Sequence, residues 1–283
     1  MADTVGEALR LGRARLQAAA SPTAMLDARL LLQEVAGLSH EQVVAEPGHR
    51  LTPDEQQRYE AALARREAGE PVSRIIGRRE FFGRDFRVTP AVLDPRPDTE
   101  TLVDLVLRMA GELAHLRLLD LGTGSGILAV TLLAELPDAA GVACDVSAEA
   151  LAVAQANAAS HGVGDRLAFH HGSWFEGLDG VFDVIVSNPP YIPSADIAAL
   201  AVAVKDHDPR AALDGGVDGL DPYRVIAAAA RTHLRPGGVV AVEFGAGQAE
   251  AVADIFHAAG FARWGEGVDL GGHVRCAAFE VVY

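Results

Sequence analysis

Segments with strand character alternate with helical patterns from about residue 116 onward, and this alternation constrains the fold more than any other feature of the chain. It predicts an α/β fold in which helices cover both faces of a parallel sheet. The expected strands lie at 116–120, 140–145, 166–170, 181–187 and 238–244. The expected helices lie at 126–136, 147–160, 220–234 and 248–259. Two late strands, near 261–268 and 273–282, predict an antiparallel hairpin at the sheet edge.

The N-terminal part, residues 4–69, carries repeated helix-start signals. Thr52-x-x-Glu55 has the spacing of a capping box and includes a first-turn proline, and Ser39-x-x-Gln42 has the same spacing. Ser21-Pro22 places a capping residue before a first-turn proline. Together with apolar residues at helical spacing, these signals predict a small helical bundle that closes near Gly69.

A short hairpin is predicted beyond the bundle, because Glu80–Phe82 and Asp85–Val88 flank Gly83-Arg84, a two-residue connection with glycine first. Farther on, the stretch 206–221 is too long and polar for a tight connection, and loops of this size are often functional lids. The expected domains are a helical N-terminal domain at 1–74, a hairpin linker at 75–96 and an α/β domain at 97–283.

Charge is distributed unevenly along the 283 residues, whose formal net charge is −15. Residues 1–96 hold fourteen arginines and fourteen carboxylates, whereas residues 97–283 hold ten basic and twenty-five acidic residues. An acidic α/β domain argues against a nucleic-acid partner, which needs a basic surface. Six arginines between 74 and 96 are either a solvated surface or a docking patch for an acidic partner. They are Arg74, Arg78, Arg79, Arg84, Arg87 and Arg96.

Neither export nor membrane insertion is expected. No apolar run reaches the roughly 18 residues that a membrane helix requires, and the N-terminus lacks a basic flank followed by an apolar core. The two cysteines, Cys144 and Cys276, are far apart in the sequence and indicate neither a disulfide framework nor a metal site. We therefore expect a cytoplasmic protein with no membrane partner and no metal.

A glycine loop lies between the first strand and its helix. Leu118–Ile127 reads Leu-Leu-Asp-Leu-Gly-Thr-Gly-Ser-Gly-Ile, so the backbone at the three glycines can approach a ligand closely. A tight strand-to-helix turn can use the same glycines. The next strand, however, ends at Asp145, whose carboxylate is well placed to accept both ribose hydroxyls of a nucleoside. The candidate cofactor-binding residues of the loop are Gly122, Thr123, Gly124, Ser125 and Gly126.

The spacing of this loop favours S-adenosylmethionine over a dinucleotide. A pyrophosphate prefers G-x-G-x-x-G, whereas this loop runs G-x-G-x-G after an acidic residue. Asp120 either holds the cationic amino-acid end of the cofactor or caps the helix. Trp174 either borders the adenine or packs in the core.

The strand Phe182–Ser187 runs directly into Asn188-Pro189-Pro190-Tyr191, which resembles the signature of class I S-adenosylmethionine-dependent methyltransferases that act on planar nitrogens. Such a nitrogen is a poor nucleophile because its lone pair is delocalised. The Asn188 side chain and the Pro189 carbonyl could accept its two N–H groups and orient it toward the methyl group. Tyr191 could pack against the planar group, and Asn188 also borders the cofactor. A rigid proline turn without chemistry is the structural alternative.

Further motifs resemble the bacterial peptide chain release factor glutamine N5-methyltransferases, the HemK/PrmC family, over nearly the whole chain. The motifs lie at 71–77, 80–83, 95–100, 208–220 and 243–248. The resemblance implies a Rossmann-like seven-stranded methyltransferase sheet and a helical N-terminal domain that recognises the substrate. It implies S-adenosylmethionine as cofactor, S-adenosylhomocysteine as product, and the glutamine of the Gly-Gly-Gln loop in class I release factors as substrate. The residues implied for the site are Gly122 to Gly126, Asp145 and Trp174 for the cofactor, with Asn188, Pro189, Pro190 and Tyr191 for the glutamine.

Some positions depart from the family pattern. Asp94 stands where an apolar residue usually precedes Pro-Arg-Pro, and His207-Asp208 replace Tyr-Glu. Arg96 either contacts the substrate loop or pairs with an acid such as Glu100. The competing functions are a glutamine methyltransferase of a ribosomal protein, an adenine N6-methyltransferase of nucleic acid, and a binding module without catalysis.

Overall fold

The computed structural model describes residues 3–111 and 115–282 and divides into two compact units. One unit comprises Met1–Arg78 with Ala201–His207, and the other comprises Arg79–Leu200 with Asp208–Tyr283. We refer to them as the helical unit and the α/β unit. The domain limits expected from the sequence, at 74 and 96, stay a prediction.

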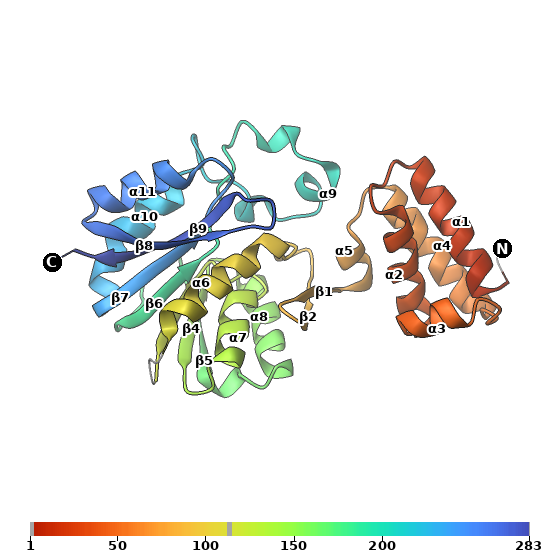
Figure 1. Ribbon diagram of the computed structural model, residues 1–283, viewed down its shortest axis with the longest axis horizontal. Coiled ribbons are helices and arrows are strands. Elements are labelled where there is room, and N and C mark those ends of the chain that lie inside the picture. The colour runs from red at the N-terminus through yellow and green to blue at the C-terminus, as the bar shows by residue number, and fades with distance from the viewer. Residues whose placement is uncertain (1–2, 112–114, 283) are drawn as a thin grey trace. The chain divides into compact units, whose positions relative to one another are not determined.

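The helical unit consists of short helices around their own apolar core (Figure 1). The predicted capping boxes at Ser39 and Thr52 are both present. Ser21 is not a helix cap, because the helix after it begins at Ala24; its hydroxyl instead donates to Asp27 at 2.7 Å. The helices are α1 (Val5–Ala18), α2 (Ala24–Ala36), α3 (His40–Ala45), α4 (Pro53–Glu67), α5 (Val72–Ile76) and α9 (Val202–Lys205).

The predicted hairpin is present, but its turn is one residue earlier than expected. Strand β1 (Arg78–Phe81) and strand β2 (Arg84–Arg87) are joined by Phe82-Gly83. Both turn residues have positive φ, 51° and 71°, which is the type I′ geometry that matches the twist of a hairpin. Phe82 donates its N–H to the Glu100 carboxylate at 2.9 Å, a tertiary contact that supports this strained conformation.

The α/β unit contains a seven-stranded sheet, as predicted, with strand order β5-β4-β3-β6-β7-β9-β8 (Figure 1). Strands β3 to β7 of this sheet pair in parallel, and β9 pairs antiparallel with both β7 and β8. The late hairpin is therefore antiparallel and at the edge, with β8 outermost. The strands are β3 (Arg117–Leu121), β4 (Ala140–Asp145), β5 (Leu167–His171), β6 (Phe182–Ser187), β7 (Leu234–Glu243), β8 (Phe261–Val268) and β9 (Val274–Val281).

Helices cover both faces of this sheet, and each face has its own apolar core. Helices α6 (Glu100–Ala110), α7 (Ile127–Glu135) and α8 (Ala148–Ser160) contribute to one core, and α10 (Asp221–Ala230) and α11 (Ala249–Ala258) contribute to the other (Figure 1). Helix α10 ends earlier than the predicted 220–234, because Arg231–His233 form a 3-10 turn. Further 3-10 turns are η1 (Pro97–Thr99), η2 (Gly164–Arg166), η3 (Ile197–Ala199) and η4 (Arg210–Ala212).

The strand order reverses between β3 and β6, and this switch point positions the site. The chain proceeds from β3 outward to β4 and β5, then returns to β6 on the other side of β3. Loops that leave the carboxyl ends of β3 and β6 diverge there and open a crevice. Leu121 pairs with Ser187, so the glycine loop and Asn188 begin side by side.

Candidate active site

A cavity of about 410 Å³ lies at this switch point, entirely within the α/β unit. It is formed by the loops after β3, β4, β5 and β6, together with residues 90–99 and 209–212. Of the residues expected from the sequence, it brings together Gly122, Thr123, Gly124, Ser125, Asp145, Trp174, Asn188, Pro190 and Arg96. Asp120, Gly126, Pro189 and Tyr191 lie next to these residues in the sequence but outside the cavity lining.

The three loop glycines have positive φ of 70°, 55° and 82°, but they serve two purposes. A Cβ at Gly122 or Gly124 would meet no heavy atom within 4 Å. At these two positions the cavity wall therefore consists of backbone alone, and a ligand can approach it closely. A Cβ at Gly126 would lie 3.1 Å from that of Ala154 on α8. Gly126 therefore allows close packing of two helices, and its role toward the cofactor stays a prediction.

Asp145 is held in place by backbone N–H groups on both of its carboxylate oxygens. Gly124 donates at 2.9 Å to one oxygen and Ser147 donates at 2.8 Å to the other. The carboxylate is half-buried and lines the cavity. Because an ionised carboxylate has about four acceptor sites, two remain for hydroxyl groups of a ligand.

Asp120 is fully buried at the carboxyl end of β3, directly before the glycine loop. One carboxylate oxygen accepts hydrogen bonds from the Thr123 hydroxyl at 2.6 Å and the Ala129 N–H at 3.2 Å, so it supports the loop and the first turn of α7. The other oxygen is buried without a hydrogen-bond partner. Burial raises the pKa of Asp120 to about 7, against the lowering effect of the two hydrogen bonds.

Trp174 is both a cavity residue and a core residue, and its role beside an adenine stays a prediction. It lines the cavity and also packs against the apolar core beneath α10 and α11. Its φ of 52° is unusual for a tryptophan, and the Cys144 thiol donates to its carbonyl at 3.2 Å. The strained backbone places an aromatic side chain at the cavity wall.

The Asn188-Pro189-Pro190-Tyr191 turn is anchored from several directions. The Asn188 carboxamide donates to the Thr99 hydroxyl at 3.2 Å, and Gln248 donates to the Tyr191 carbonyl at 3.0 Å. Pro189 is buried, whereas Asn188 and Pro190 line the cavity. Tyr191 packs against the α10 and α11 core, and burial raises its pKa to about 12. The phenol is therefore neutral at physiological pH.

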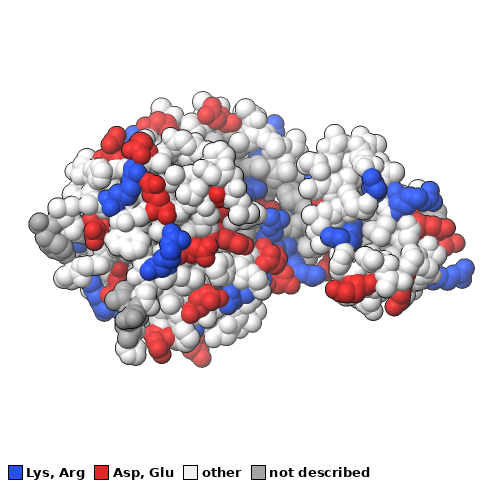
Figure 2. Space-filling view, viewed as in Figure 1, with Lys and Arg blue, Asp and Glu red and all other residues white. Residues whose placement is uncertain are grey.

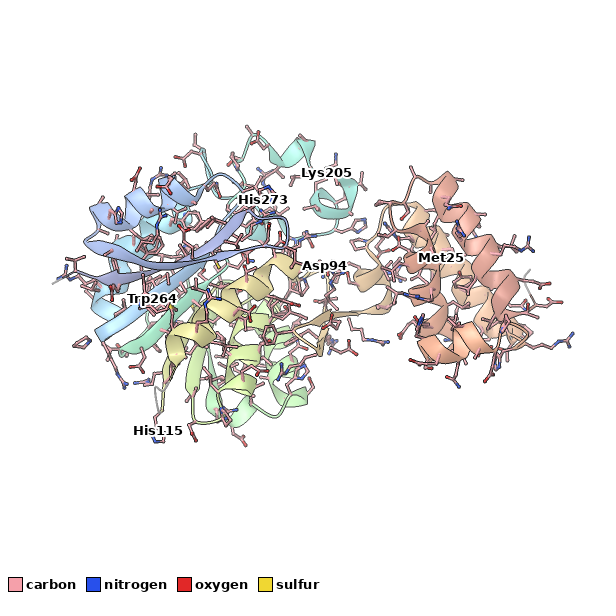
Figure 3. All side chains as sticks on the ribbon, viewed as in Figure 1. Met25, Asp94, His115, Lys205, Trp264 and His273 are labelled. Carbon is pink, nitrogen blue, oxygen red and sulfur yellow. The ribbon has the colours of Figure 1, made fainter. Side chains whose placement is uncertain are left out.

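Arg96 pairs with an acid, but the acid is Asp208 rather than Glu100. The Arg96 guanidinium donates to Asp208 at 2.7 Å, and the other Asp208 oxygen accepts the Asp94 N–H at 3.1 Å. Asp94, labelled in Figure 3, is buried, and one of its own carboxylate oxygens has no hydrogen-bond partner. Asp208 thus ties the segment before η1 to the wall formed by Pro209, Ala211 and Ala212.

Ion pairs within the chain take up at least three of the six arginines between 74 and 96. Besides Arg96, Arg78 pairs with Glu34 at 2.6 Å and Arg84 pairs with Glu135 at 2.6 Å. Elsewhere, acidic side chains are spread over the visible face of the α/β unit (Figure 2). No helix in the described ranges 3–111 and 115–282 is long and apolar enough to cross a membrane.

Sequence reasoning missed three residues at this site. Thr99 is fully buried beside Asn188, Glu243 is buried at the end of β7, and Asp208 holds Arg96. Each lies inside a motif that carried the family resemblance, at 95–100, 208–220 and 243–248. The motifs therefore signalled that the residues matter, but their contacts depend on pairing between distant segments.

Comparison with known proteins agrees with this geometry. The PrmC N-terminal domain family matches residues 7–77, and the methyltransferase small domain family matches residues 97–205. The fold is similar to that of a solved ribosomal protein L11 methylase from Lactobacillus delbrueckii subsp. bulgaricus. The TM-score is 0.51 at 22% identity, over 70% of this chain and 86% of that one.

Two curated relatives are much more similar. The release factor glutamine methyltransferase of Agrobacterium fabrum is 46% identical over 98% of this chain and 97% of its own length. That of Cereibacter sphaeroides is 48% identical over 95% of each chain. With such relatives along almost its whole length and a methyltransferase fold around the cavity, this chain belongs to the release factor glutamine methyltransferase family.

Proposed function

We propose that this chain transfers a methyl group from S-adenosylmethionine to the side-chain amide nitrogen, N5, of the glutamine in the Gly-Gly-Gln motif of class I peptide chain release factors. The observation that carries the proposal is the shared cavity of the glycine loop and Asn188, which begin on paired strands. The loop proposed to bind the nucleoside and the turn proposed to bind the amide therefore line the same cavity. The names of the relatives supply the protein substrate.

The residues at the cofactor end of the cavity fit S-adenosylmethionine. Gly122 and Gly124 leave the backbone open, and Asp145 has acceptor capacity left for the ribose hydroxyls. Trp174, on the cavity wall, is suited to the adenine of the cofactor. Asp120 is buried outside the cavity lining, and its unpartnered oxygen is proposed to attract the cationic amino-acid end of the cofactor from beneath the glycine loop. Thr123 and Ser125 complete this wall. S-adenosylmethionine, when bound, supplies an electrophilic methyl group whose bond to sulfur breaks with the electron pair retained by sulfur, giving S-adenosylhomocysteine.

The residues at the other end orient the nucleophile. An amide nitrogen carries two N–H groups, and the Asn188 side-chain oxygen and the Pro189 carbonyl are the acceptors that would hold them. Such hydrogen bonds place the nitrogen lone pair toward the methyl carbon and strengthen as positive charge develops on nitrogen. The nitrogen forms the new N–C bond as the bond between methyl and sulfur breaks, and then releases one of its two protons to solvent water, so that the product is a neutral N-methyl amide. Tyr191 is neutral and would contribute packing rather than base catalysis.

The helical N-terminal domain, taken as 1–74 with a hairpin linker at 75–96, is proposed to recognise the release factor. Its match to the PrmC N-terminal domain family supports this role. Arg96 is proposed to face the substrate loop from the cavity wall while it pairs with Asp208. The α/β unit is acidic, which supports a protein substrate over nucleic acid.

Incubation with labelled S-adenosylmethionine and a class I release factor, followed by peptide mass spectrometry, tests the proposal. We expect one methyl group on the Gly-Gly-Gln peptide, and none on a release factor whose motif glutamine is replaced by alanine. Ribosomal proteins and DNA offered in parallel distinguish the other two substrates. Label on either of these, with an unmodified Gly-Gly-Gln peptide, would reverse the assignment.

Asn188→Ala tests the role of the turn in the same assay. We expect kcat to fall by about a hundredfold or more, because the variant loses an oriented acceptor at the reacting nitrogen. The dissociation constant of S-adenosylmethionine should change little, since Asn188 is expected only to border the cofactor. Near-normal turnover in Asn188→Ala would rule out the proposed role.

A further inference from the structure

Glu243 is buried beside the active site and has no role in the proposed chemistry. It is the last residue of β7, is 2% exposed, and does not line the cavity. One of its carboxylate oxygens is buried without a hydrogen-bond partner. A buried and incompletely satisfied carboxylate costs stability, so its presence here calls for a physical reason.

The sheet register brings Glu243 next to Asn188. In the parallel pair of β6 and β7, Ser187 is opposite Val242, so Asn188, which follows β6, and Glu243, which ends β7, are the next residues along the two chains. The Thr99 hydroxyl and the Asn188 carboxamide lie close enough to the Glu243 carboxylate to lower its pKa. Thr99 in turn accepts from the Asn188 carboxamide at 3.2 Å. The three side chains therefore form one polar network at the cavity wall, in which Thr99 and Asn188 line the cavity and Glu243 lies behind them.

The chemistry of these groups fixes the direction of each hydrogen bond. An ionised carboxylate can only accept, so toward Glu243 the Thr99 hydroxyl can act only as a donor. The Thr99 oxygen is then an acceptor toward Asn188, and the group that it contacts must be the NH₂ of the carboxamide. The carboxamide oxygen is left for the cavity, which is the orientation that an acceptor of substrate N–H groups requires.

We propose that Glu243 is a positioning residue that, through Thr99 and directly, holds the Asn188 carboxamide with its oxygen toward the substrate nitrogen. This inference rests on the proposed function of Asn188. The inference gives a reason for a carboxylate at position 243. A glutamine there could donate as well as accept hydrogen bonds and would permit both orientations of the Asn188 carboxamide. The inference also explains why the buried Thr99 carries a hydroxyl.

Protonation of Glu243 should reverse the network. Burial raises the pKa of Glu243 to about 7, against the lowering effects of Thr99, Arg275 and Asn188. Below that pH the carboxyl group can donate to Thr99, which can then donate to the carboxamide oxygen. The titratable and charged groups that face Glu243 are Asp98, Tyr191, Tyr223, Arg275 and Cys276. For the wild-type protein we expect kcat to fall as the pH drops below about 7.

The test compares kcat, KM and the pH profile of Glu243→Gln with those of wild type, using labelled S-adenosylmethionine and a class I release factor. At pH 8 we expect a fall in kcat of about tenfold, the lower end of what loss of an orienting partner costs. The fall of kcat below pH 7 should flatten, because the titrating group is gone. The dissociation constant of S-adenosylmethionine should stay within about twofold, since Glu243 does not line the cavity.

Variants of Thr99 test the same network without changing the carboxylate. Thr99→Val removes the hydroxyl and should reduce kcat as Glu243→Gln does, whereas Thr99→Ser should restore it. The matched control is Thr131→Val, because Thr131 on α7 is equally buried and its hydroxyl has no partner. This control should leave kcat unchanged.

Wild-type kcat and an unchanged pH profile in Glu243→Gln would overturn the inference, as would equal activity of Thr99→Val and Thr99→Ser. If Glu243→Gln fails to fold, the comparison of Thr99→Val with Thr99→Ser decides whether the inference holds. A wild-type protein that methylates a substrate other than the release factor glutamine contradicts the proposed function instead. The same variants, assayed on that substrate, still decide the role of Glu243.

Discussion

The Asp208 carboxylate accepts a 2.7 Å hydrogen bond from Arg96, a residue 112 positions earlier in the chain. The Asp208 side chain is fully buried, and its second oxygen holds the Asp94 N–H. One carboxylate therefore fixes two segments of the cavity wall. Because the bond uses the backbone of Asp94, nothing in the structure explains the carboxyl group of Asp94 itself.

Asp208→Asn should destabilise the protein by about 1–2 kcal/mol, less than loss of a fully buried pair because Arg96 remains in contact with water. The KM for the release factor should rise several-fold as the cavity wall loosens. Urea denaturation and steady-state kinetics measure the two effects. The control is Asp218→Asn, which breaks an exposed pair with Arg224 and should have the smaller effect on stability because water screens that pair. Equal effects of the two substitutions would contradict the structural role of Asp208.

Local sequence was sufficient to predict most of the sheet, because apolar strands and caps are encoded in short segments. Strand β6 begins within one residue of its predicted start, and helix α8 likewise. Strand β7 begins earlier than predicted, at Leu234, although Pro236, Gly237 and Gly238 indicate a turn. Leu234 pairs with Phe182 across a register shift, a tertiary contact that overrides this local signal.

The candidate site likewise contains residues that local sequence predicted and residues that it did not. The glycine loop, Asp145 and Asn188 were predictable because each ends or directly follows a strand whose carboxyl end is near the switch point. The partners of these residues were not predictable, since Thr99 meets Asn188 and Glu243 only through the packing of η1 and the strand register. The motif at 95–100 resembles the family pattern, which indicated that its residues matter but not which contacts Thr99 makes.

Asp145→Ala should weaken S-adenosylmethionine binding with less effect on kcat at saturating cofactor. Loss of charge-assisted hydrogen bonds to the ribose, at about 1.5–3 kcal/mol, corresponds to about a ten- to hundredfold rise in the dissociation constant. The variant also frees the Gly124 and Ser147 N–H groups, so its thermal stability should be recorded beside calorimetric binding. An unchanged dissociation constant would contradict the assignment of Asp145 to the ribose.

Alanine at Gly124 and at Gly126 should produce different defects. Both glycines have positive φ, which costs an alanine about 1 kcal/mol. Gly126→Ala adds a clash with Ala154, so it should lower the free energy of unfolding by more than Gly124→Ala does. Gly124→Ala places a methyl group in open space at the cavity and should chiefly weaken cofactor binding. Urea denaturation and calorimetry on both variants check the contrast, and identical profiles would refute it.

Asp120 should make the stability of the fold depend on pH in the direction opposite to that of a salt-bridged carboxylate. Burial raises its pKa from the ordinary 3.8 to about 7, so between these values the folded protein holds a proton that the unfolded chain releases. The free energy of unfolding should therefore fall as the pH rises from about 4 to about 7, by up to about 4 kcal/mol, and this contribution is absent above pH 7. Asp120→Asn keeps an acceptor for Thr123 and Ala129 and should make the decline shallower. Urea denaturation at several pH values measures the slope, with the exposed Asp138→Asn as control. A slope in Asp120→Asn equal to that of wild type would show that Asp120 does not bind this proton.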